Sequence, residues 1–503
     1  MAPLTALSVG LFAGPQPLDD AFITLRYARS IAEGNGFVFN IGEHVLGTTT
    51  PLFALVLAVL HRLTSVDLVW LAYGLALAAH VGTVVLIGII GRSCAAPVAG
   101  AIAGMLYALA PMVVSATVGC MEASLFTFAS LYSLAPSRRA PSVWRAVAAA
   151  AAALLRPEGV LAVGVYLLRA TRINLRFALR STAVIAGGIL PWVVFATWYF
   201  GSPLPQSLIA KWNIHTAVGG LAPEMIWNLL VSVPIALPAP SWVPFAPAPF
   251  GTMVAHNLTF PADPEIRRIV ALAIGTLTLL TACIGAIVLY RRNPATVWVL
   301  LFTASFGAAY ATARPAIFPW YLIPLLPILL LTFVVGGSFT LRTVLRRPWL
   351  ETVAAAAAGL VLIGVAAQRC ASLVSSFPSP RERGYREAVR IVGEPAQDPA
   401  VLVGALEIGA IGYYTRARIL DHFGLVSPEI PALGTAAAIE RCRPDFYIGQ
   451  PVLFWFLGFP QTPEFVREYI VAGHVSYPGA PDTLIYMRRD FLSQRSLARP
   501  ECP

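Results

Sequence analysis

The chain has 503 residues, of which 57% are hydrophobic and only 12% are charged. With a mean hydropathy of +0.72, this composition excludes an ordinary soluble protein, because runs of about 20 apolar residues recur and each can cross a bilayer as a helix. The net charge of +10 would suggest nucleic acid as the partner of a soluble protein. Here the arginines cluster at the ends of apolar runs, which indicates membrane topology and no nucleic acid.

A polar stretch from Leu18 to Pro51 precedes the apolar bulk of the chain. Asp19 and Asp20 open a predicted amphipathic helix, and Gly34-Asn35-Gly36 ends it. Such a helix can lie on a membrane surface and present both carboxylates at the outer face. The acids allow two interpretations. One Asp can cap the helix, which stabilises it by about 1 kcal/mol, or the pair can act as a general base or metal ligand facing a lipid-linked substrate.

The apolar segments that follow predict a polytopic α-helical membrane protein with about 11 transmembrane helices. The segments are 51–63 (a half-helix at the outer interface), 68–90, 98–117, 123–135, a dipping pair at 146–155 and 160–168, 182–200, 269–290, 295–311, 317–335 and 353–367. The first segment, Met1–Ala13, is short for a span and lacks a basic n-region, so we expect an incomplete first helix.

Arginine clusters then all fall on one side of the membrane, at 92, 138–145, 169–180, 291–292 and 342–347. The positive-inside rule makes that side cytoplasmic. The opposite, outer side carries Asp19, Asp20, Glu122, Arg156, Lys211, Arg314 and the C-terminal region. The sequence therefore predicts a multi-pass protein of the plasma (inner) membrane with its polar candidate residues outside the cell.

The character of the chain changes after about Ser379, where a βαβ-like pattern begins. Short apolar runs predict four strands, at 400–403, 418–421, 445–448 and 483–487, with 407–414 as a connector. We expect a membrane domain over 1–370, with outer loops at 17–51 and 201–266, and a small extracytoplasmic α/β domain over 379–503.

The six cysteines form no C-x-x-C pair, so no zinc site or redox motif is indicated. Cys442 and Cys502 can pair in an oxidising compartment, but free thiols are favoured. Carboxylates and histidines form no cluster at metal-ligand spacing. We therefore expect no structural metal and no certain cofactor, although a divalent cation can bind Asp19 and Asp20.

Several motifs match one superfamily in order and spacing over nearly the whole chain. They are Asp19-Asp20-Ala21-Phe22-Ile23 with Arg26-Tyr27-Ala28-Arg29, Glu33-Gly34, Gly36, Phe39-Asn40, Gly42-Glu43 and Thr50-Pro51; Gly119-Cys120-Met121-Glu122; Leu155-Arg156-Pro157-Glu158-Gly159; Gly201-Ser202-Pro203-Leu204-Pro205 with Ala210-Lys211; Glu407-Ile408-Gly409-Ala410-Ile411-Gly412-Tyr413; and Leu420-Asp421 with Gly424-Leu425. The chain resembles GT-C glycosyltransferases, and in particular the actinobacterial cell-wall arabinofuranosyltransferases that cap arabinan chains, with their uncharacterised relatives. It departs from that pattern in its short first helix, at Thr48-Thr49-Thr50 and at Gln206-Ser207.

The resemblance implies an inverting hexosyl- or pentosyltransferase. It would move a sugar, arabinofuranose for example, from a polyprenyl-phosphate donor to a cell-envelope glycan or lipid on the outer membrane face. An acid of the first outer loop takes the proton of the acceptor hydroxyl, and cations stabilise the departing phosphate. We expect Asp19 as the base and Asp20 as its partner, because Asp19 and Arg26 are seven residues apart and share a helix face, although the two roles can be exchanged.

The candidates for binding the donor phosphate or substrate are Arg26, Glu122, Arg156, Lys211, Arg314 and His44. All but Arg26 have a structural alternative, and that of Arg314 is like that of Lys211. Arg156 can pair with Glu158, Glu122 can interact with a helix dipole, and Lys211 can be an interfacial lysine. His44, like His215, can be merely solvated or hydrogen-bonded.

A second function class fits the same composition, namely a flippase or permease for a lipid-linked glycan whose soluble domain binds carbohydrate. A transporter carries polar residues near the bilayer midplane, often in repeated halves. Here the acids and Lys211 lie at the predicted outer edge and no repeat is visible. The sequence therefore favours the transferase.

Overall fold

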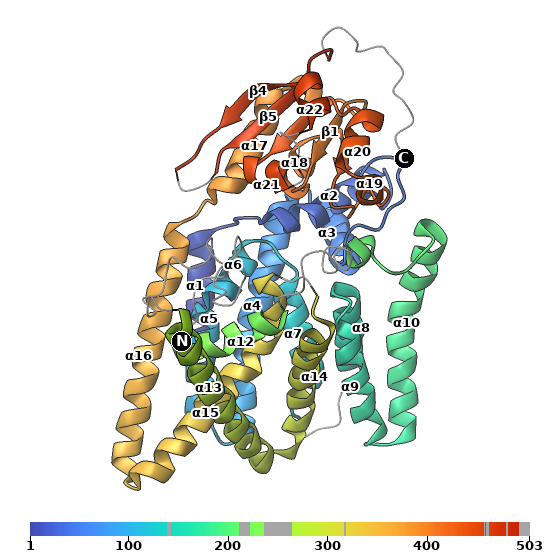
Figure 1. Ribbon diagram of the computed structural model, residues 1–503. Coiled ribbons are helices and arrows are strands. Elements are labelled where there is room, and N and C mark those ends of the chain that lie inside the picture. The colour runs from blue at the N-terminus through green and yellow to red at the C-terminus, as the bar shows by residue number, and fades with distance from the viewer. Residues whose placement is uncertain are drawn as a thin grey trace. The chain divides into compact units, whose positions relative to one another are not determined.

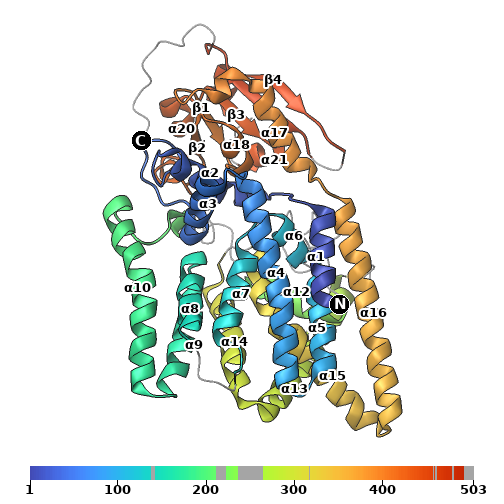
Figure 2. The same ribbon diagram turned by 180° about the vertical axis from the view of Figure 1, so that it is seen from behind.

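The computed structural model describes residues 1–137, 142–210, 222–235, 264–315, 318–456, 458, 462–478 and 481–491. The chain divides into two compact units. The helical unit comprises Met1–Pro15, Tyr73–Pro191 and Ile214–Ser376, and the mixed unit comprises Gln16–Ala72, Trp192–Asn213 and Phe377–Pro503. Figures 1 and 2 show the elements of both units from opposite sides.

The helical unit is built almost entirely from α-helices. They are α1 (Ala2–Ala13), α4 (Leu68–Ser93), α5 (Pro97–Leu109), α6 (Pro111–Val118), α7 (Ala123–Leu134), α8 (Val143–Leu155), α9 (Gly159–Thr171), α10 (Leu175–Phe200), α12 (Ala222–Ser232), α13 (Pro264–Arg292), α14 (Val297–Ala313), α15 (Leu326–Leu345) and α16 (Pro348–Ser375). Three 3₁₀ turns join them, η1 (Val233–Ile235), η2 (Pro294–Thr296) and η3 (Pro319–Leu325). Part of helix α4 and part of helix α10 belong to the mixed unit.

Six helices of the described chain are long and apolar enough to cross a membrane. A seventh span results if α5 and α6 count together, although they are bent by 53° at Pro111, where proline removes a helix hydrogen bond. Five further apolar helices are shorter, namely α1, α3, α7, α8 and α9. The predicted polytopic helical class is confirmed, and the expected number of about 11 spans agrees only approximately.

Helices α13 and α15 pack closely through glycines. A Cβ atom on Gly285 would lie 1.8 Å from the carbonyl oxygen of Thr332, and one on Gly336 would lie 1.9 Å from that of Thr281. Small residues let helix backbones approach in this way where lipid provides no hydrophobic driving force between them. This contact fixes one side of the helical unit.

Basic residues gather where the helices of this unit turn. The turns α9–α10, α13–α14 and α15–α16 lie at the same end of the helical unit, at the bottom of Figure 1. Arg292 Nη1 donates to the Ala95 carbonyl oxygen at 3.3 Å, and Arg169 Nη1 donates to that of Leu134 at 3.1 Å. These arginines therefore close the turns as well as charging this end of the unit.

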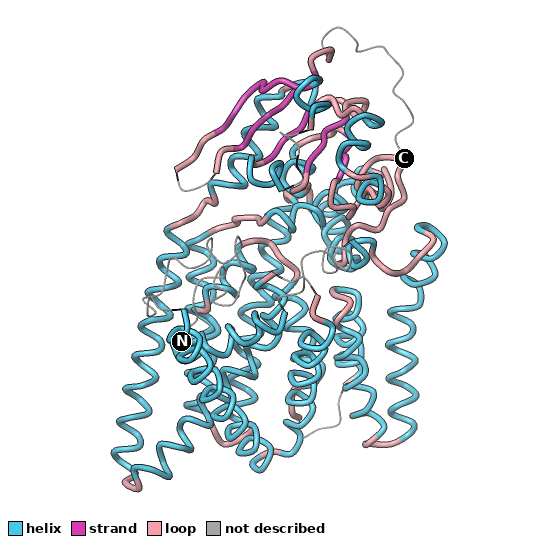
Figure 3. The backbone as a smooth tube through the Cα atoms, viewed as in Figure 1, coloured by secondary structure: helices cyan, strands magenta, loops and turns pink. Residues whose placement is uncertain are grey.

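The mixed unit combines a five-stranded sheet with helices from both ends of the chain. Its elements are α2 (Asp19–Glu33), α3 (Pro51–Thr64), α17 (Pro380–Val392), η4 (Glu394–Gln397), β1 (Leu402–Ala405), α18 (Gly409–Tyr414), β2 (Arg418–Asp421), α19 (Ile430–Leu433), α20 (Thr435–Cys442), β3 (Phe446–Gly449), α21 (Pro451–Phe456), α22 (Pro463–Glu468), β4 (Tyr469–Val475) and β5 (Thr483–Arg488). Figure 3 shows the strands in magenta among the helices.

The strand order is β2-β1-β3-β5-β4. Strand β1 runs parallel to β2 and β3, with Val403 opposite Ile419 and Phe446, whereas β5 runs antiparallel to β3 and β4. Strands β1 and β3 are buried along their whole length, as expected for parallel strands covered on both faces. The predicted strands correspond to β1, β2, β3 and β5. Strand β4 was missed, because this edge strand leaves Val471 exposed and carries an irregularity next to Gly473.

The main hydrophobic cluster of this sheet consists of Leu406, Ile439, Tyr447, Phe454, Phe465 and Tyr469. Cys442, at the end of α20, is disulfide-bonded, so the preference for a free thiol at this position was wrong. Cys502 lies outside the described residues. The four other cysteines are free.

Candidate functional site

The N-terminus of α2 presents the paired acids, but neither caps its own helix. The N-cap residue is Leu18, and no side chain caps the helix. Asp19 instead accepts hydrogen bonds from another helix: its Oδ2 from the Gly409 N–H at 3.1 Å and its Oδ1 from the Ala410 N–H at 2.7 Å. With 6% of its surface exposed, Asp19 satisfies the free N–H groups at the start of α18.

Two glycines allow α2 and α18 to lie so close together. A Cβ atom on Gly409 would lie 1.8 Å from the Asp19 carbonyl oxygen, and one on Gly412 would lie 2.7 Å from Cζ of Phe39. At Gly409 a side chain would require a shift of the backbone, and at Gly412 it would require the Phe39 ring to move. This gives a physical reason for the glycines in the Glu407-to-Tyr413 motif.

Arg26 joins the same contact and is buried with 3% exposure. Its guanidinium donates to the carbonyl oxygens of Phe39, Gly412 and Ala417 at 2.7, 2.6 and 3.0 Å, and to Oδ1 of Asn40 at 3.3 Å. Burial lowers its pKa to about 9, which still leaves it charged at neutral pH. Arg26 therefore holds the protein backbone together, and we assign it no part in phosphate binding.

A cluster of acids surrounds one guanidinium beside this contact. Glu407, which follows β1, accepts from Arg381 Nη1 at 2.8 Å and from the hydroxyl of Tyr385. Arg381 Nη2 also donates to Glu382 at 2.6 Å. Burial, opposed by Arg381, raises the pKa of Glu407, and the same burial raises the pKa of Tyr385.

Asp19 interacts electrostatically with Glu407 and Arg381 of this cluster. Burial raises its pKa to about 8, and repulsion from Glu407 adds to the rise, while Arg381 and the Ala410 N–H oppose it. Burial and a neighbouring carboxylate both disfavour the charged form of an acid. Asp19 is therefore expected to hold a proton at neutral pH.

Asp20 differs from its neighbour in burial and in hydrogen bonding. Its side chain is half-buried, and within the described ranges it takes part in no hydrogen bond or ion pair. It is the one acid of the pair whose oxygens are not committed to the protein. Among the same residues, no group of three or more His, Cys, Asp or Glu side chains is placed to hold a metal ion, and we assign no metal ligands.

His44 lies in the loop after α2 and is exposed. Its ring stacks on that of Tyr199 with the centroids 4.1 Å apart. Tyr199 belongs to an aromatic run at the end of α10 with Trp192, Phe195 and Phe200, against which Phe37 packs. Aromatic residues gathered at a helix end are typical of the membrane–water interface. His44 thus has an aromatic partner, and no described contact ties it to a phosphate site.

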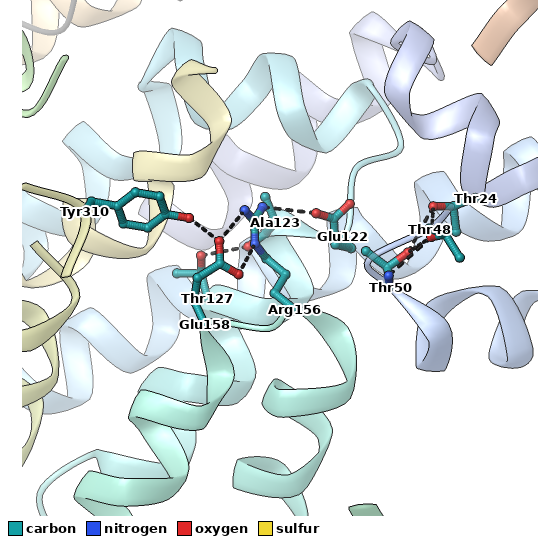
Figure 4. A network of polar contacts seen from close by, with 9 residues as sticks. All are labelled: Thr24, Thr48, Thr50, Glu122, Ala123, Thr127, Arg156, Glu158 and Tyr310. Carbon is teal, nitrogen blue, oxygen red and sulfur yellow. Dashed lines mark hydrogen bonds and ion pairs between the residues drawn. The ribbon is translucent and has the colours of Figure 1, made fainter. Parts of the chain in front are cut away.

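Glu122 and Arg156 meet in the helical unit, as shown in Figure 4. Arg156, with 3% exposure, binds Glu122 at 3.1 Å and Glu158 at 3.0 Å. The hydroxyl of Tyr310 also donates to Glu158, and the ring of Tyr321 lies 4.2 Å from the guanidinium carbon. Two carboxylates already balance the charge of Arg156, as expected for a buried ion in apolar surroundings.

Figure 4 also shows a triangle of threonine hydroxyls in the mixed unit. Thr24 lies 3.1 Å from Thr48 and 3.0 Å from Thr50, and Thr48 lies 3.0 Å from Thr50. All three residues are buried. The unusual threonines at 48–50 therefore satisfy one another and join the end of the loop to α2.

The two remaining cationic candidates are not equally placed. Arg314, at the end of α14, is 56% exposed and forms an ion pair with Glu224 at 3.3 Å. An exposed pair of this kind contributes little to stability, so the guanidinium can exchange partners. Lys211, like His215, lies outside the described residues, and its role stays a prediction.

Sequence reasoning missed the contribution of the C-terminal segment to this region. Glu407 was placed at the start of the predicted connector 407–414, and Arg381 and Tyr385 were given no role. Asp421, in contrast, accepts from the N–H groups of Phe423, Leu425 and Val426, as expected of a turn residue. The signal that could have identified Glu407 is its place at the head of a motif with two closely spaced glycines.

A family model named "Domain of unknown function (DUF8728)" matches residues 377–488. No curated protein sequence matches the chain. Among solved structures, the chain is similar to ArnT from Cupriavidus metallidurans bound to undecaprenyl phosphate, with a TM-score of 0.55, 12% identity and coverage of 99% of this chain and 98% of that one. The apo state of the same protein matches with a TM-score of 0.52 at 12% identity, over 96% of each chain.

The oligosaccharyltransferase of Archaeoglobus fulgidus, tethered to an acceptor peptide containing the NVT sequon, matches with a TM-score of 0.57 and 12% identity. The match covers 99% of this chain and 74% of that one. At such low identity the likeness concerns the fold alone. The chain therefore has the GT-C fold, with membrane helices and a small C-terminal sheet domain.

Proposed function

We propose that this protein is an inverting membrane glycosyltransferase that moves a sugar from a polyprenyl-phosphate donor to a glycan or lipid of the cell envelope. The observation that carries the proposal is the acid pair at the start of α2. Asp19 is bound to two backbone N–H groups, whereas the neighbouring Asp20 is held in place by the same helix with its carboxylate bound by no residue of the described ranges. Support also comes from the fold, which is that of a protein solved with undecaprenyl phosphate.

In this proposal Asp20 is the general base and Asp19 is a positioning residue, the reverse of the assignment expected from helix spacing. A base must reach the proton that it abstracts, and Asp19 is 6% exposed with both oxygens occupied. Two neighbouring acids in different environments commonly divide their roles in this way.

The reaction follows from these roles. The carboxylate of Asp20 removes the proton of the acceptor hydroxyl as that oxygen attacks the anomeric carbon of the donor sugar. The bond between the anomeric carbon and the phosphate oxygen breaks on the opposite face, so the configuration inverts and the polyprenyl phosphate leaves with its electron pair. Negative charge grows on that phosphate and needs a cation, for which we propose Lys211 and Arg314.

Arg156 is left out of the phosphate site, because Glu122 and Glu158 bind it at 3.1 and 3.0 Å. We propose that all three residues brace the helical unit. The arginine-rich turns of that unit favour a cytoplasmic position under the positive-inside rule. The proposed reaction then takes place on the opposite, extracytoplasmic side of the plasma membrane.

The sugar and the acceptor are tested by reconstitution. Proteoliposomes of the wild type would be supplied with polyprenyl-phosphate pentofuranose, hexose and aminopentose donors, each with an envelope glycan acceptor. The resemblance of the motifs favours consumption of the pentofuranosyl donor. Movement of the intact donor between leaflets without release of polyprenyl phosphate would support the flippase alternative instead.

A further inference from the structure

We propose that Glu407 is a positioning residue for this transfer, supplied by the C-terminal segment, which fixes the turn that binds Asp19 beside the proposed base. The inference rests on the proposed function, and it adds a residue from the sheet domain to a site that the sequence places in the first outer loop. The geometry that supports it is the contact of α2 with the turn between β1 and α18.

The turn after β1 is held on both sides. On one side Glu407 is fixed by Arg381 at 2.8 Å and by the hydroxyl of Tyr385, both from α17. On the other side the N–H groups of Gly409 and Ala410 bind the carboxylate of Asp19. Glu407 lies two residues before Gly409, so any movement of this turn changes both contacts together.

The charges in this place do not balance. Asp20 comes from α2, Glu407 from the turn after β1, and Arg381 with Glu382 from α17. Asp19, Glu382 and Glu407 all interact with the one guanidinium of Arg381, which Glu382 and Glu407 already share as ion-pair partners, and Asp20 repels both Asp19 and Glu407. Carboxyl groups that share one site cannot all be ionised, because like charges repel strongly where water is excluded.

The proton therefore resides on the group that is most deeply buried and repelled by Glu407, which is Asp19. A neutral Asp19 places no second negative charge beside Asp20 at the start of α2. Removing the charge of Glu407 would let Asp19 ionise at lower pH, which would place a second negative charge beside Asp20. Glu407 thus acts on the base through Asp19 and does not touch the substrate.

Two variants separate this role from a purely structural one. Glu407→Gln removes the charge but can still accept a hydrogen bond. Glu382→Gln removes a charge that also binds Arg381 and serves as the matched control. Because Glu407 raises the pKa of Asp19 and Glu382 does not, we expect Glu407→Gln to move the alkaline limb of the pH–rate profile downward by about half a pH unit or more, with Glu382→Gln unchanged. An equal loss of rate at every pH would overturn the positioning role.

A second measurement needs no activity. The unfolding temperature of the wild type, Asp19→Asn, Glu407→Gln and the double variant would be followed from pH 5 to 9 as a double-mutant cycle. We expect the wild type to lose stability as pH rises, each single variant to lose less, and the second substitution to add little to the first. Additive effects, or a wild type without this pH dependence, would overturn the coupling of Glu407 to Asp19. Coupling without transfer from any donor would refute the proposed function alone.

Discussion

Replacing Asp19 by Asn is expected to stabilise the protein at neutral pH, although it disturbs a buried hydrogen-bonded site. The pKa of Asp19 is raised from 3.8 to about 8. At pH 7 the folded protein therefore holds a proton that the unfolded chain lacks. Protonating Asp19 on folding at pH 7 lowers the free energy of unfolding by about 4 kcal/mol. The unfolded carboxyl has a pKa of 3.8, and each pH unit between 3.8 and 7 corresponds to about 1.4 kcal/mol.

An asparagine has no ionisation cost but makes a poorer cap for α18. Its amide oxygen accepts one of the two N–H groups that Asp19 binds, while its NH₂ group faces the other donor. An unsatisfied buried donor costs about 1–3 kcal/mol. The difference leaves Asp19→Asn more stable than the wild type by about 1–3 kcal/mol at pH 7.

The assay is thermal unfolding in detergent, followed by tryptophan fluorescence between pH 5 and 9. A pKa raised in the folded state means that the folded state binds more protons, so wild-type stability should fall as pH rises toward about 8. Asp19→Asn should lack most of this fall. The control is Asp398→Asn, whose exposed carboxylate binds the nearby Ala400 N–H and no other group in the part of the chain that the structure describes. A destabilised Asp19→Asn with unchanged pH dependence would refute the assignment of a proton to Asp19.

Four further outcomes are expected. Gly409→Ala should destabilise the protein by about 1–3 kcal/mol, because its Cβ would lie 1.8 Å from a backbone oxygen. Gly164→Ala, with open space around it, should leave the stability unchanged. Unfolding midpoints that agree for the two variants would contradict the tight contact. Arg156→Gln should cost about 3–5 kcal/mol by leaving buried carboxylates unpaired; a stable variant with weaker donor binding would restore its role as a ligand. Lys211→Ala should raise the KM for the donor with little change for the acceptor, and steady-state kinetics showing the converse would exclude a phosphate role. A cysteine at Ser379 should react with impermeant reagents added outside the cell, and labelling only from the cytoplasm would invert the proposed topology.

Local patterns predicted the local structure well. Hydropathy located the membrane helices because each span buries its own backbone hydrogen bonds and needs no distant partner. The paired acids and Gly34 likewise delimited α2, which runs from Asp19 to Glu33 and ends at a left-handed Gly34. Both signals act over a few residues, and both can be read without knowing the fold.

The partners of the candidate residues could not be predicted in this way. The spacing of Asp19 and Arg26 correctly placed them on one side of α2, and both bind α18 or the residues beside it. That side was interpreted as polar and exposed, whereas it is buried against backbone from the far end of the chain. A carboxylate that caps a distant helix looks the same in sequence as a carboxylate that waits for a substrate.

Burial also decided which of two similar residues is free. Asp19 and Asp20 are adjacent and identical in type, and only the contacts with Gly409 and Ala410 distinguish them. Arg156 and Arg314 were both candidates for the phosphate, yet one is enclosed by two glutamates and the other is largely exposed. These differences arise from tertiary contacts, which no local pattern contains.

The most direct test of the central claim is the single-turnover rate of sugar transfer for the wild type, Asp19→Asn and Asp20→Asn, reconstituted side by side with the donor that the wild type consumes. The account predicts that Asp20→Asn loses about 10²–10⁴-fold in rate, the span expected for loss of a general base, with its unfolding temperature unchanged. It predicts that Asp19→Asn stays within about tenfold of the wild type, outside that span. An Asp20→Asn variant that keeps more than about a tenth of the wild-type rate would contradict the claim that Asp20 is the base.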